Sequence, residues 1–321
     1  MRQFRSVLAY VDTRNNSMAA VQTAVDVAKR GASRVLAMRV VDLDLAPLSP
    51  HLGGNDWENY LLRVALVEQR ALQAKVEAYR ATVPVSAQVR VGKPSLELIR
   101  EVMAAGHDLV IKVASGTANQ QRVAFGSTGM HLVRKCPAPV WLTPADATPP
   151  RRILCAVNPG PEGDEERRRL SCKIVAHGLA LARHFDARLD IVHALRPSSY
   201  AAVGHPQVVE GRASISRRLE SLADTVIRES GLGFAGVRVQ VLDGEPEIAI
   251  SELAMDGLAT LIVLGAIGRP GIAGLLIGEL SEDILLRVRC GVFCVKPDGF
   301  VSPLLGLATP TYEPRQLSEE A

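Results

Sequence analysis

The feature that most constrains the fold is an internal duplication. The segment VRVGKPSLELIREVMAAGHDLVIKVASG (89–116) has a counterpart in VQVLDGEPEIAISELAMDGLATLIVLGAIG (239–268). The turn at Gly92-Lys-Pro recurs as Gly244-Glu-Pro, 152 residues later. Each copy shows an alternating strand, a Gly-x-Pro turn, an amphipathic helix and an apolar strand. A chain with this duplication is expected to fold as two similar halves.

The openings of the two halves repeat as well. The first half opens on an apolar strand that ends at Asp12, and the second opens on a matching strand that ends at Asn158. Further strands are expected at 34–41, 139–142, 188–193 and 292–296, and helices near 57–81 and 212–230. Strands that alternate with crossover helices pair in parallel. The predicted fold class is therefore α/β, with two tandem doubly wound parallel-sheet domains.

A proline-rich stretch, TPADATPPRR, separates the halves. It continues neither a helix nor a strand, so we place the first domain at residues 1–146, a linker at 147–150 and the second domain at 151–298. Residues 299–321 show no amphipathic period and are expected to form a loosely attached tail. The closing strand of each half is apolar and would otherwise be an exposed sheet edge. We therefore expect each of these edges to be covered.

Composition sets the broad class of the protein. The 321 residues suffice for two domains with cores of their own, and with 4% aromatic residues, Ala, Val and Leu must build them. The 37 basic and 34 acidic residues nearly balance, which gives no sign of a nucleic-acid partner. No run approaches the roughly 18 apolar residues that span a bilayer, and the N-terminus lacks a signal-peptide core. We expect no membrane span and a cytoplasmic location.

Metal sites and catalytic motifs are not indicated. The histidines at 177, 184 and 193 have no metal-ligand spacing, so we expect no metal. The five cysteines form no CxxC pair, which favours buried free thiols. These cysteines are Cys136, Cys155, Cys172, Cys290 and Cys294. No GxSxG, HExxH or GxxxxGK[ST] motif occurs, so no catalytic residue is assigned.

A glycine-rich loop follows an apolar strand late in each half. In the second half the glycines have the spacing G-x2-G-x9-G: Gly265, Gly268 and Gly278. Glycines let backbone N–H groups approach phosphate oxygens, and the N-terminus of a following helix adds a positive dipole. The first half keeps Gly116 and Gly126, but Val113 replaces its first glycine. Gly126 lies two residues closer to Cys136 than Gly278 does to Cys290, so we expect a shortened or displaced helix after the first loop.

Taken together, these features resemble the universal stress protein family in its tandem two-domain type. The likeness covers about residues 1–298 and includes the closing segments HLVRKCPAPVW and GRPGIAGLLIGELSEDILLRVRCGVFCVKPDGF. It implies an adenine-nucleotide α-hydrolase-like fold in each half. It also implies that the halves pair through their closing strands, around a pseudo-two-fold axis, as a pseudo-dimer. In the nucleotide-binding branch of this family, ATP lies at the carboxyl ends of the strands. There the aspartate after the first strand receives the base, and the loop G-x2-G-x9-G-[S/T] wraps the phosphates.

The resemblance implies two sets of binding residues. In the first half these are Asp12, Val41, Gly116, Gly126 and Ser127. In the second half they are Asn158, Gly265, Gly268 and Gly278, with Ser281 as a hydroxyl just beyond Glu279. Neither set is complete, because the first lacks a glycine and the second has an asparagine for the aspartate and a glutamate at the hydroxyl position.

Two substitutions are expected to weaken these sites. Val113 resists a positive φ, and its methyl groups are expected to lie where a phosphate would approach. A Glu279 carboxylate about 4 Å from a phosphate costs roughly 1 to 4 kcal/mol, unless Mg²⁺ bridges the two. Replacing Glu279 by serine is therefore expected to raise ATP affinity at this half by at least about tenfold. The other interpretation of both loops is that they are structural turns.

Residues and resemblance together favour a non-catalytic stress-response protein that binds a small ligand or a protein partner. An adenine nucleotide, ATP with Mg²⁺ if it is bound, is the candidate ligand. One alternative is an ATP-binding protein with slow ATPase activity. Another is a carrier of an apolar small molecule, because residues 43–62 form a long, leucine-rich connection that includes Trp57. The pseudo-dimer needs no second copy, although a homodimer is compatible with it.

Overall fold

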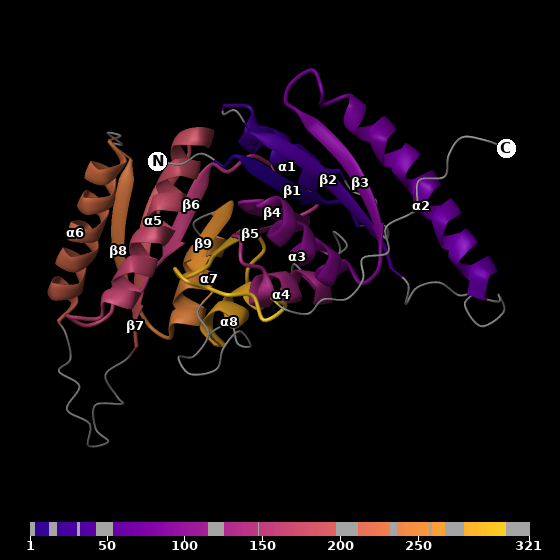
Figure 1. Ribbon diagram of the computed structural model, residues 1–321. Helices are drawn as coiled ribbons and strands as arrows, with labels where there is room; N and C mark the ends of the chain where they lie inside the picture. The colour runs from indigo at the N-terminus through magenta and orange to yellow at the C-terminus, as the bar shows by residue number, and fades with distance from the viewer. Residues whose placement is uncertain are drawn as a thin grey trace.

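The computed structural model describes residues 4–12, 18–30, 33–42, 54–114, 125–146, 148–196, 211–231, 236–256, 259–266 and 279–305. Within these ranges strands and helices alternate along the chain, and the strands form one continuous layer that runs through the molecule (Figure 1). The alternation that the hydrophobic periodicity predicts is thus present in both halves.

The first half contains five strands and four helices within the described ranges. In chain order these are β1 (Ser6–Tyr10), α1 (Ala19–Ala28), β2 (Arg34–Val41), α2 (Gly54–Glu77), β3 (Val85–Val91), α3 (Pro94–Ala105), β4 (Leu109–Val113), α4 (Gly126–Lys135) and β5 (Val140–Thr143). The second half repeats this order. Its elements are β6 (Arg152–Ala156), α5 (Glu165–Phe185), β7 (Arg188–Leu195), α6 (Arg212–Ser230), β8 (Val237–Asp243), α7 (Pro246–Asp256), β9 (Leu261–Gly265), α8 (Glu279–Arg287) and β10 (Gly291–Val295).

One ten-stranded sheet joins the two halves, in the order β3-β2-β1-β4-β5-β10-β9-β6-β7-β8. Neighbouring strands are parallel within each half, whereas β5 and β10 are antiparallel, with Trp141 opposite Phe293. The closing strands therefore pair with each other, as their apolar character predicts. The order of each half changes direction between its first and fourth strands, which is where doubly wound folds bind ligands.

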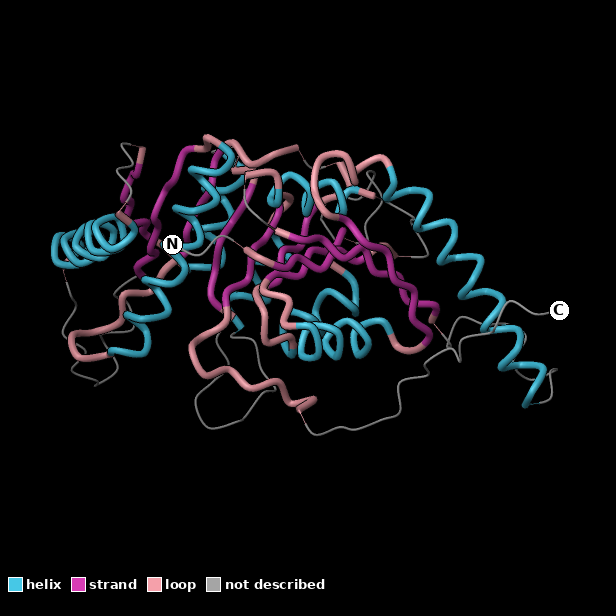
Figure 2. The backbone as a smooth tube through the Cα atoms, turned by 45° about the horizontal axis from the view of Figure 1, so that its top comes forward, coloured by secondary structure: helices cyan, strands magenta, loops and turns pink. Residues whose placement is uncertain are grey.

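Helices cover both faces of the sheet (Figure 2). The apolar side chains of α1, α2, α5 and α6 pack on one face, and those of α3, α4, α7 and α8 pack on the other. Alternate residues of each strand enter one core or the other. Val7 and Ala9 belong to the first core, and Leu8 and Tyr10 belong to the second.

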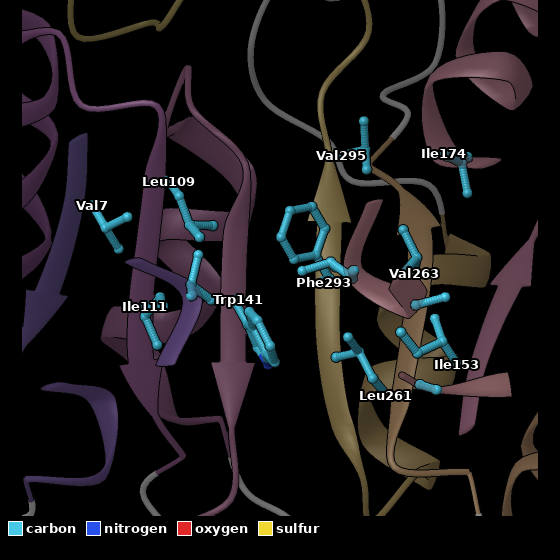
Figure 3. Packing of buried hydrophobic residues seen from close by; sticks show 14 of the residues in the cluster. Val7, Leu109, Ile111, Trp141, Ile153, Ile174, Leu261, Val263, Phe293 and Val295 are labelled. Atoms are coloured by element: carbon cyan, nitrogen blue, oxygen red, sulfur yellow. The ribbon is translucent and has the colours of Figure 1, made fainter. Parts of the chain in front are cut away.

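The two halves meet along a seam, where β5 pairs with β10. Aromatic side chains and polar contacts hold the halves together there. Trp141 and Phe293 face each other across the seam, with ring centroids 6.0 Å apart (Figure 3). On one face, Nε2 of His184 donates to the backbone oxygen of Asp26 over 2.6 Å. On the other, the guanidinium of Arg134 donates twice to Oε1 of Glu282, over 2.6 and 2.9 Å. The buried ammonium of Lys296 also donates to the backbone oxygen of Val133.

The repeated Gly-x-Pro turns have the same conformation in both halves. Gly92 and Gly244 have φ values of 148° and 129°, and a proline follows in the first turn of α3 and of α7. Gly106 ends α3 in the left-handed conformation.

Two local expectations need correction. Helix α2 begins at Gly54, three residues before its predicted start. The helix after the first loop is not shortened: α4 has 10 residues and α8 has 9. The expectation failed because Cys290 directly precedes β10, whereas Cys136 lies four residues before β5, so the two cysteines are not equivalent. All five cysteines are free, and burial raises the pKa of Cys136, Cys290 and Cys294 to about 12.

Candidate functional site

The predicted base-binding residues of the first half lie at the carboxyl edge of its sheet. Asp12 follows β1 and is only 4% exposed. Val41 is the last residue of the neighbouring β2 and is half-buried against a small apolar cluster. This cluster consists of Leu61, Ala65 and Val91, with Trp57 and Tyr60 packed beside it. The sheet therefore brings Asp12 and Val41 to adjacent strand ends, as the prediction requires.

Two of the residues predicted to bind phosphate in the first half, Gly126 and Ser127, lie at the start of α4. Gly126 is the first residue of this helix and has a φ of 66°, a conformation that favours glycine. Ser127 follows it and is exposed, so its hydroxyl faces solvent at the positive end of the helix. Gly116 lies outside the described residues. The left-handed Gly126 and the N-terminus of α4, at the described end of this loop, are features that suit the binding of an anion.

One charged residue near this site was not predicted. Lys112 is fully buried in β4, opposite Tyr10 of β1, and its Nζ donates to the backbone oxygen of Val113 over 2.7 Å. The lysine thus holds the last residue of β4, from which the glycine loop departs. A signal was available in the sequence, because the second half has Leu264 where the first half has this lysine within an apolar run.

Basic side chains also gather around α4. The pKa of His131 is lowered, first by burial and then by the charges of Lys135, Lys93 and Arg134. Lys93 is the residue before α3, and the other two lie in the last turn of α4. This side of the first half therefore carries a positive field.

In the second half, the side chain that replaces the aspartate takes part in an internal turn. Oδ1 of Asn158 accepts from the backbone N–H of Gly160 over 3.0 Å, and the backbone oxygen of Asn158 accepts from the Ser171 hydroxyl over 2.7 Å. Below it, Nδ1 of His193 donates to the backbone oxygen of Val157, and burial lowers the pKa of this histidine. The acceptor end of the Asn158 amide is thus already occupied.

The first glycine of the second loop lies under a helix. A Cβ added to Gly265 would be 2.8 Å from Cδ2 of Leu170 and 3.2 Å from Cδ1 of Ile174, both on α5. Its φ is not positive. A glycine is therefore needed here for close packing between α5 and β9, and this need exists without any ligand.

The other residues of the second loop are only partly described. Ser281 is 7% exposed, and its hydroxyl donates to the backbone oxygen of Gly265 over 2.9 Å. This hydrogen bond joins α8 to the end of β9. Glu279 is the first residue of α8, and Gly268 and Gly278 lie outside the described residues.

Comparisons with known proteins agree with this architecture. The model of the "Universal stress protein family" matches residues 3–144 and again residues 150–296. The chain belongs to the universal stress protein family. It is similar to Universal stress protein E of Escherichia coli K12, with 27% identity over 312 residues that cover 95% of this chain and 98% of the relative. The corresponding protein of Photorhabdus laumondii is 24% identical, with the same coverage.

Solved structures of family members share the fold. The crystal structure of a putative universal stress protein from Pseudomonas aeruginosa UCBPP-PA14 has a TM-score of 0.64 and 22% identity, and covers 92% of this chain and 95% of its own. A universal stress protein from Archaeoglobus fulgidus has a TM-score of 0.66 and 17% identity, with coverage of 92% and 99%. Both neighbours extend over the two halves. The chain is thus a universal stress protein of the tandem type.

The expectation about Val113 was wrong. Its side chain is 3% exposed and belongs to the core under α1 and α5. Its methyl groups therefore fill the interior and do not point toward a phosphate. Val113 and Gly265 occupy equivalent positions, because the next residue of each chain segment donates to the backbone oxygen of a closing strand: Ala114 to Thr143, and Ala266 to Val295. In one half a valine fills this space, and in the other Leu170 does.

Among the described residues, no helix is long and apolar enough to cross a membrane. The three histidines of the sequence analysis have separate partners. His177 stacks on Phe4, His184 donates to the backbone oxygen of Asp26 in α1, and His193 donates to the backbone oxygen of Val157, just after β6. For this tandem universal stress protein, the candidate site is therefore the carboxyl edge of the sheet in each half.

Proposed function

We propose that this tandem universal stress protein binds an adenine nucleotide in its first half, and that its second half is a scaffold. The proposal rests on a difference between the two halves. The polar side chains at the start of α4 differ from those at the start of α8, and the polar residue that follows β1 differs from the one that follows β6. Ser127 is exposed at the start of α4, next to the left-handed Gly126. In the second half, Asn158, at the position of Asp12, accepts from the backbone N–H of Gly160, and Ser281, two residues beyond Glu279, donates to the backbone oxygen of Gly265.

The distribution of charge favours the same half. Residues 1–146 carry 18 basic and 12 acidic side chains, whereas residues 151–298 carry 18 and 19. The loop sequence ASGTANQQRVAFGSTG (114–129) contains no acidic residue and includes Arg122, while Glu279 stands at the end of the second loop. Nζ of Lys112 lies near the strand end that leads into the first loop, where the second half has Leu264. A nucleotide phosphate therefore meets attraction in the first half and repulsion in the second.

Binding of this kind does not require turnover. Phosphate contacts from backbone N–H groups, a hydroxyl and a helix N-terminus hold a nucleotide, but hydrolysis also needs an oriented water and stabilisation of the γ-phosphate charge in the transition state. Mg²⁺ would accompany a bound triphosphate and would be held chiefly by its phosphate oxygens. We infer a non-catalytic role in which nucleotide occupancy alters the protein's conformation or its partners.

A matched pair of variants tests the proposal. ATP with Mg²⁺ is titrated calorimetrically into the wild-type protein, Asp12→Ala and Asn158→Ala. One binding event per chain is expected, lost in Asp12→Ala and retained in Asn158→Ala. Loss in Asn158→Ala alone would move the site to the second half, and no binding to the wild-type protein would refute the proposal. Steady-state ATP hydrolysis well above background, abolished by Asp12→Ala, would contradict the non-catalytic role.

A further inference from the structure

A cavity of about 480 Å³ lies at the amino edge of the second half's sheet, beside the linker. Its walls come from the linker, the end of α7 and the residues that precede β9 and β10. The lining residues include Pro144, Asp146, Thr148, Met255, Arg289 and Cys290. The predicted nucleotide sites lie at the opposite, carboxyl edge of the sheet and share no residue with this cavity. Its volume is within the range of small-molecule sites.

The first half has a corner that corresponds to this cavity, because the sheet order is the same on both sides of the seam. Thr143 and Val295 are equivalent, since the backbone oxygen of each accepts from the residue that follows the neighbouring strand. The residues that come next correspond in turn: Pro144 to Lys296, Asp146 to Asp298 and Thr148 to Phe300.

In the first half this corner is filled by side chains. Lys296 is 3% exposed, and its Nζ donates to the backbone oxygen of Val133 near the end of α4. The same Nζ lies 4.5 Å from the centre of the Phe300 ring. Burial lowers the pKa of Lys296 to about 8, so the side chain is largely an ammonium at neutral pH. A primary ammonium, its alkyl chain and a phenyl ring thus occupy the corner together.

The second half lacks both of these side chains. Pro144 stands at the position of the lysine and Thr148 at the position of the phenylalanine, and both line the cavity. The apolar wall opposite them includes Cys290 and Met255, which is 44% exposed. The cavity therefore has the room and the surface for a body that resembles the alkylammonium and ring of the first half.

The cavity is lined by one carboxylate and one guanidinium, those of Asp146 and Arg289, and both residues are exposed. In the first half, the equivalent carboxylate of Asp298 accepts from Nζ of Lys173 over 2.8 Å. This aspartate position thus already binds an ammonium group in one half. Arg289 would favour a carboxylate instead, so the two charges make opposite predictions that probes of opposite sign can separate.

We propose that this cavity binds a primary amine with a short alkyl chain and an aromatic ring, with the ammonium group at Asp146 and the ring against Met255 and Cys290. Such a ligand contacts the linker, α7 and the start of β10 together. It would therefore hold the linker against the second half, independently of any nucleotide at the carboxyl edge of the first half.

Two probes of matched shape test the charge. 2-Phenylethylamine is the candidate ligand, and 3-phenylpropionate has the same ring and chain with a carboxylate. In ¹⁵N-labelled protein, the amine is expected to shift the amide signals of Thr148, Cys290 and Gly291 in a saturable manner, with a Kd on the order of 1 mM. The carboxylate is expected to bind at least about tenfold more weakly. No saturable shift with the amine, or equal or tighter binding of the carboxylate, would overturn the proposal.

A matched pair of variants tests the counter-ion. Asp146→Asn keeps the shape of the side chain and removes its charge, so amine affinity should fall at least about threefold. Asp298→Asn, at the equivalent position of the first half, is the control and should leave the affinity unchanged. Arg289→Gln should raise the affinity, because it removes a like charge from the wall. Equal losses in Asp146→Asn and Asp298→Asn would contradict the assignment of the ammonium group.

A third variant tests the place of the ring. Thr148→Phe gives the second half the residue that the first half has as Phe300. Its ring should fill the cavity and reduce amine affinity at least about tenfold. The fold should remain intact because Thr148 is exposed, and denaturant unfolding checks this. Unchanged amine affinity in folded Thr148→Phe would show that the ligand does not occupy this cavity.

Discussion

The ring of Phe4, in the first half, stacks on the imidazole of His177, in the second, with centroids 5.8 Å apart and planes inclined by 4°. Phe293 lies on the same histidine at 5.3 Å. His177 is therefore enclosed by two phenyl rings at the seam, and this burial, together with the charge of Lys173, lowers its pKa to about 4. The two halves consequently share an interface that tolerates only a neutral histidine.

Lowering the pH should reduce the free energy of unfolding through the titration of His177. In the unfolded chain His177 has its ordinary pKa of about 6.5, so between about pH 6.5 and pH 4 the unfolded state binds a proton that the folded state excludes. Stability is therefore full above pH 6.5 and falls as the pH drops toward 4. In urea unfolding at pH 5, His177→Phe should be more stable than the wild-type protein by about 1–2 kcal/mol, and the two should differ little at pH 7.5.

A second variant separates the histidine's titration from its packing. Phe4→Leu removes the stacked ring and opens the imidazole to water, so NMR titration should show the pKa of His177 moving upward toward 6.5. If the stability difference between His177→Phe and the wild-type protein were the same at pH 5 and pH 7.5, the pH dependence would have another source.

Gly178 of α5 and Gly265 of β9 allow α5 to pack closely against the sheet. The need for glycine can be tested at both positions. A Cβ at Gly178 would overlap the buried Sγ of Cys155, whereas one at Gly265 would press on the end of the Leu170 side chain at 2.8 Å. Gly178→Ala should cost about 2–3 kcal/mol and Gly265→Ala about 1 kcal/mol, because a leucine end moves more readily than a strand residue. Denaturant unfolding of both variants measures the difference.

The double variant Cys155→Ala with Gly178→Ala is the control for this comparison. It removes the sulfur that the new methyl group would overlap, so most of the stability lost in Gly178→Ala should return. Failure of this rescue would show that the glycine is required by the backbone of α5 and not by its contact with β6.

The sequence alone was sufficient to predict the repeated framework. The Gly-x-Pro turns and the helix at 212–230 follow from turn residues and local periodicity. The pairing of the closing strands follows from the family resemblance and from the need to cover an apolar edge, whereas their antiparallel orientation comes from the structure. These features depend on residues close together in the chain, or on a general rule for sheet edges.

The side-chain environments of Val113 and Gly265 could not be predicted in the same way. The surroundings of Gly265 depend on α5. Leu170 of that helix lies against Gly265 in the structure, but nearly a hundred residues before it in the sequence. The family motif assigns Gly265 to a ligand, but this glycine also serves the packing of α5 on β9. The burial of Lys112 was missed for a related reason, since a lone lysine in a strand is usually exposed.

This result changes what is expected of Val113→Gly. The sequence suggested that the glycine would open a phosphate site, but the valine side chain fills the core. The variant should lose about 2–4 kcal/mol of stability, from the cavity and from the added backbone freedom of glycine. Its ATP affinity should not rise when it is titrated below its unfolding temperature. A rise of tenfold or more would mean that the methyl groups do obstruct the nucleotide.

Ser127→Glu gives the first half the glutamate that the second half has at the equivalent position. Ser127 is exposed, so the change should leave the fold intact, and a carboxylate in the first turn of α4 is favourable toward the helix dipole. Near a nucleotide phosphate, however, the same charge should lower ATP affinity by at least about tenfold. The loss should shrink as salt is raised from about 0.05 to 0.5 M, because screening weakens the repulsion.

Ser127→Gln, similar in size but uncharged, should lose less affinity and show no such salt dependence. Glu279→Ser, the reverse change, should raise affinity in the second half from a much weaker starting point, since Asn158 and Ser281 remain engaged internally. Calorimetric titration of the three variants at two salt concentrations decides the matter: equal losses in Ser127→Glu and Ser127→Gln would show that size, and not charge, sets affinity at this position.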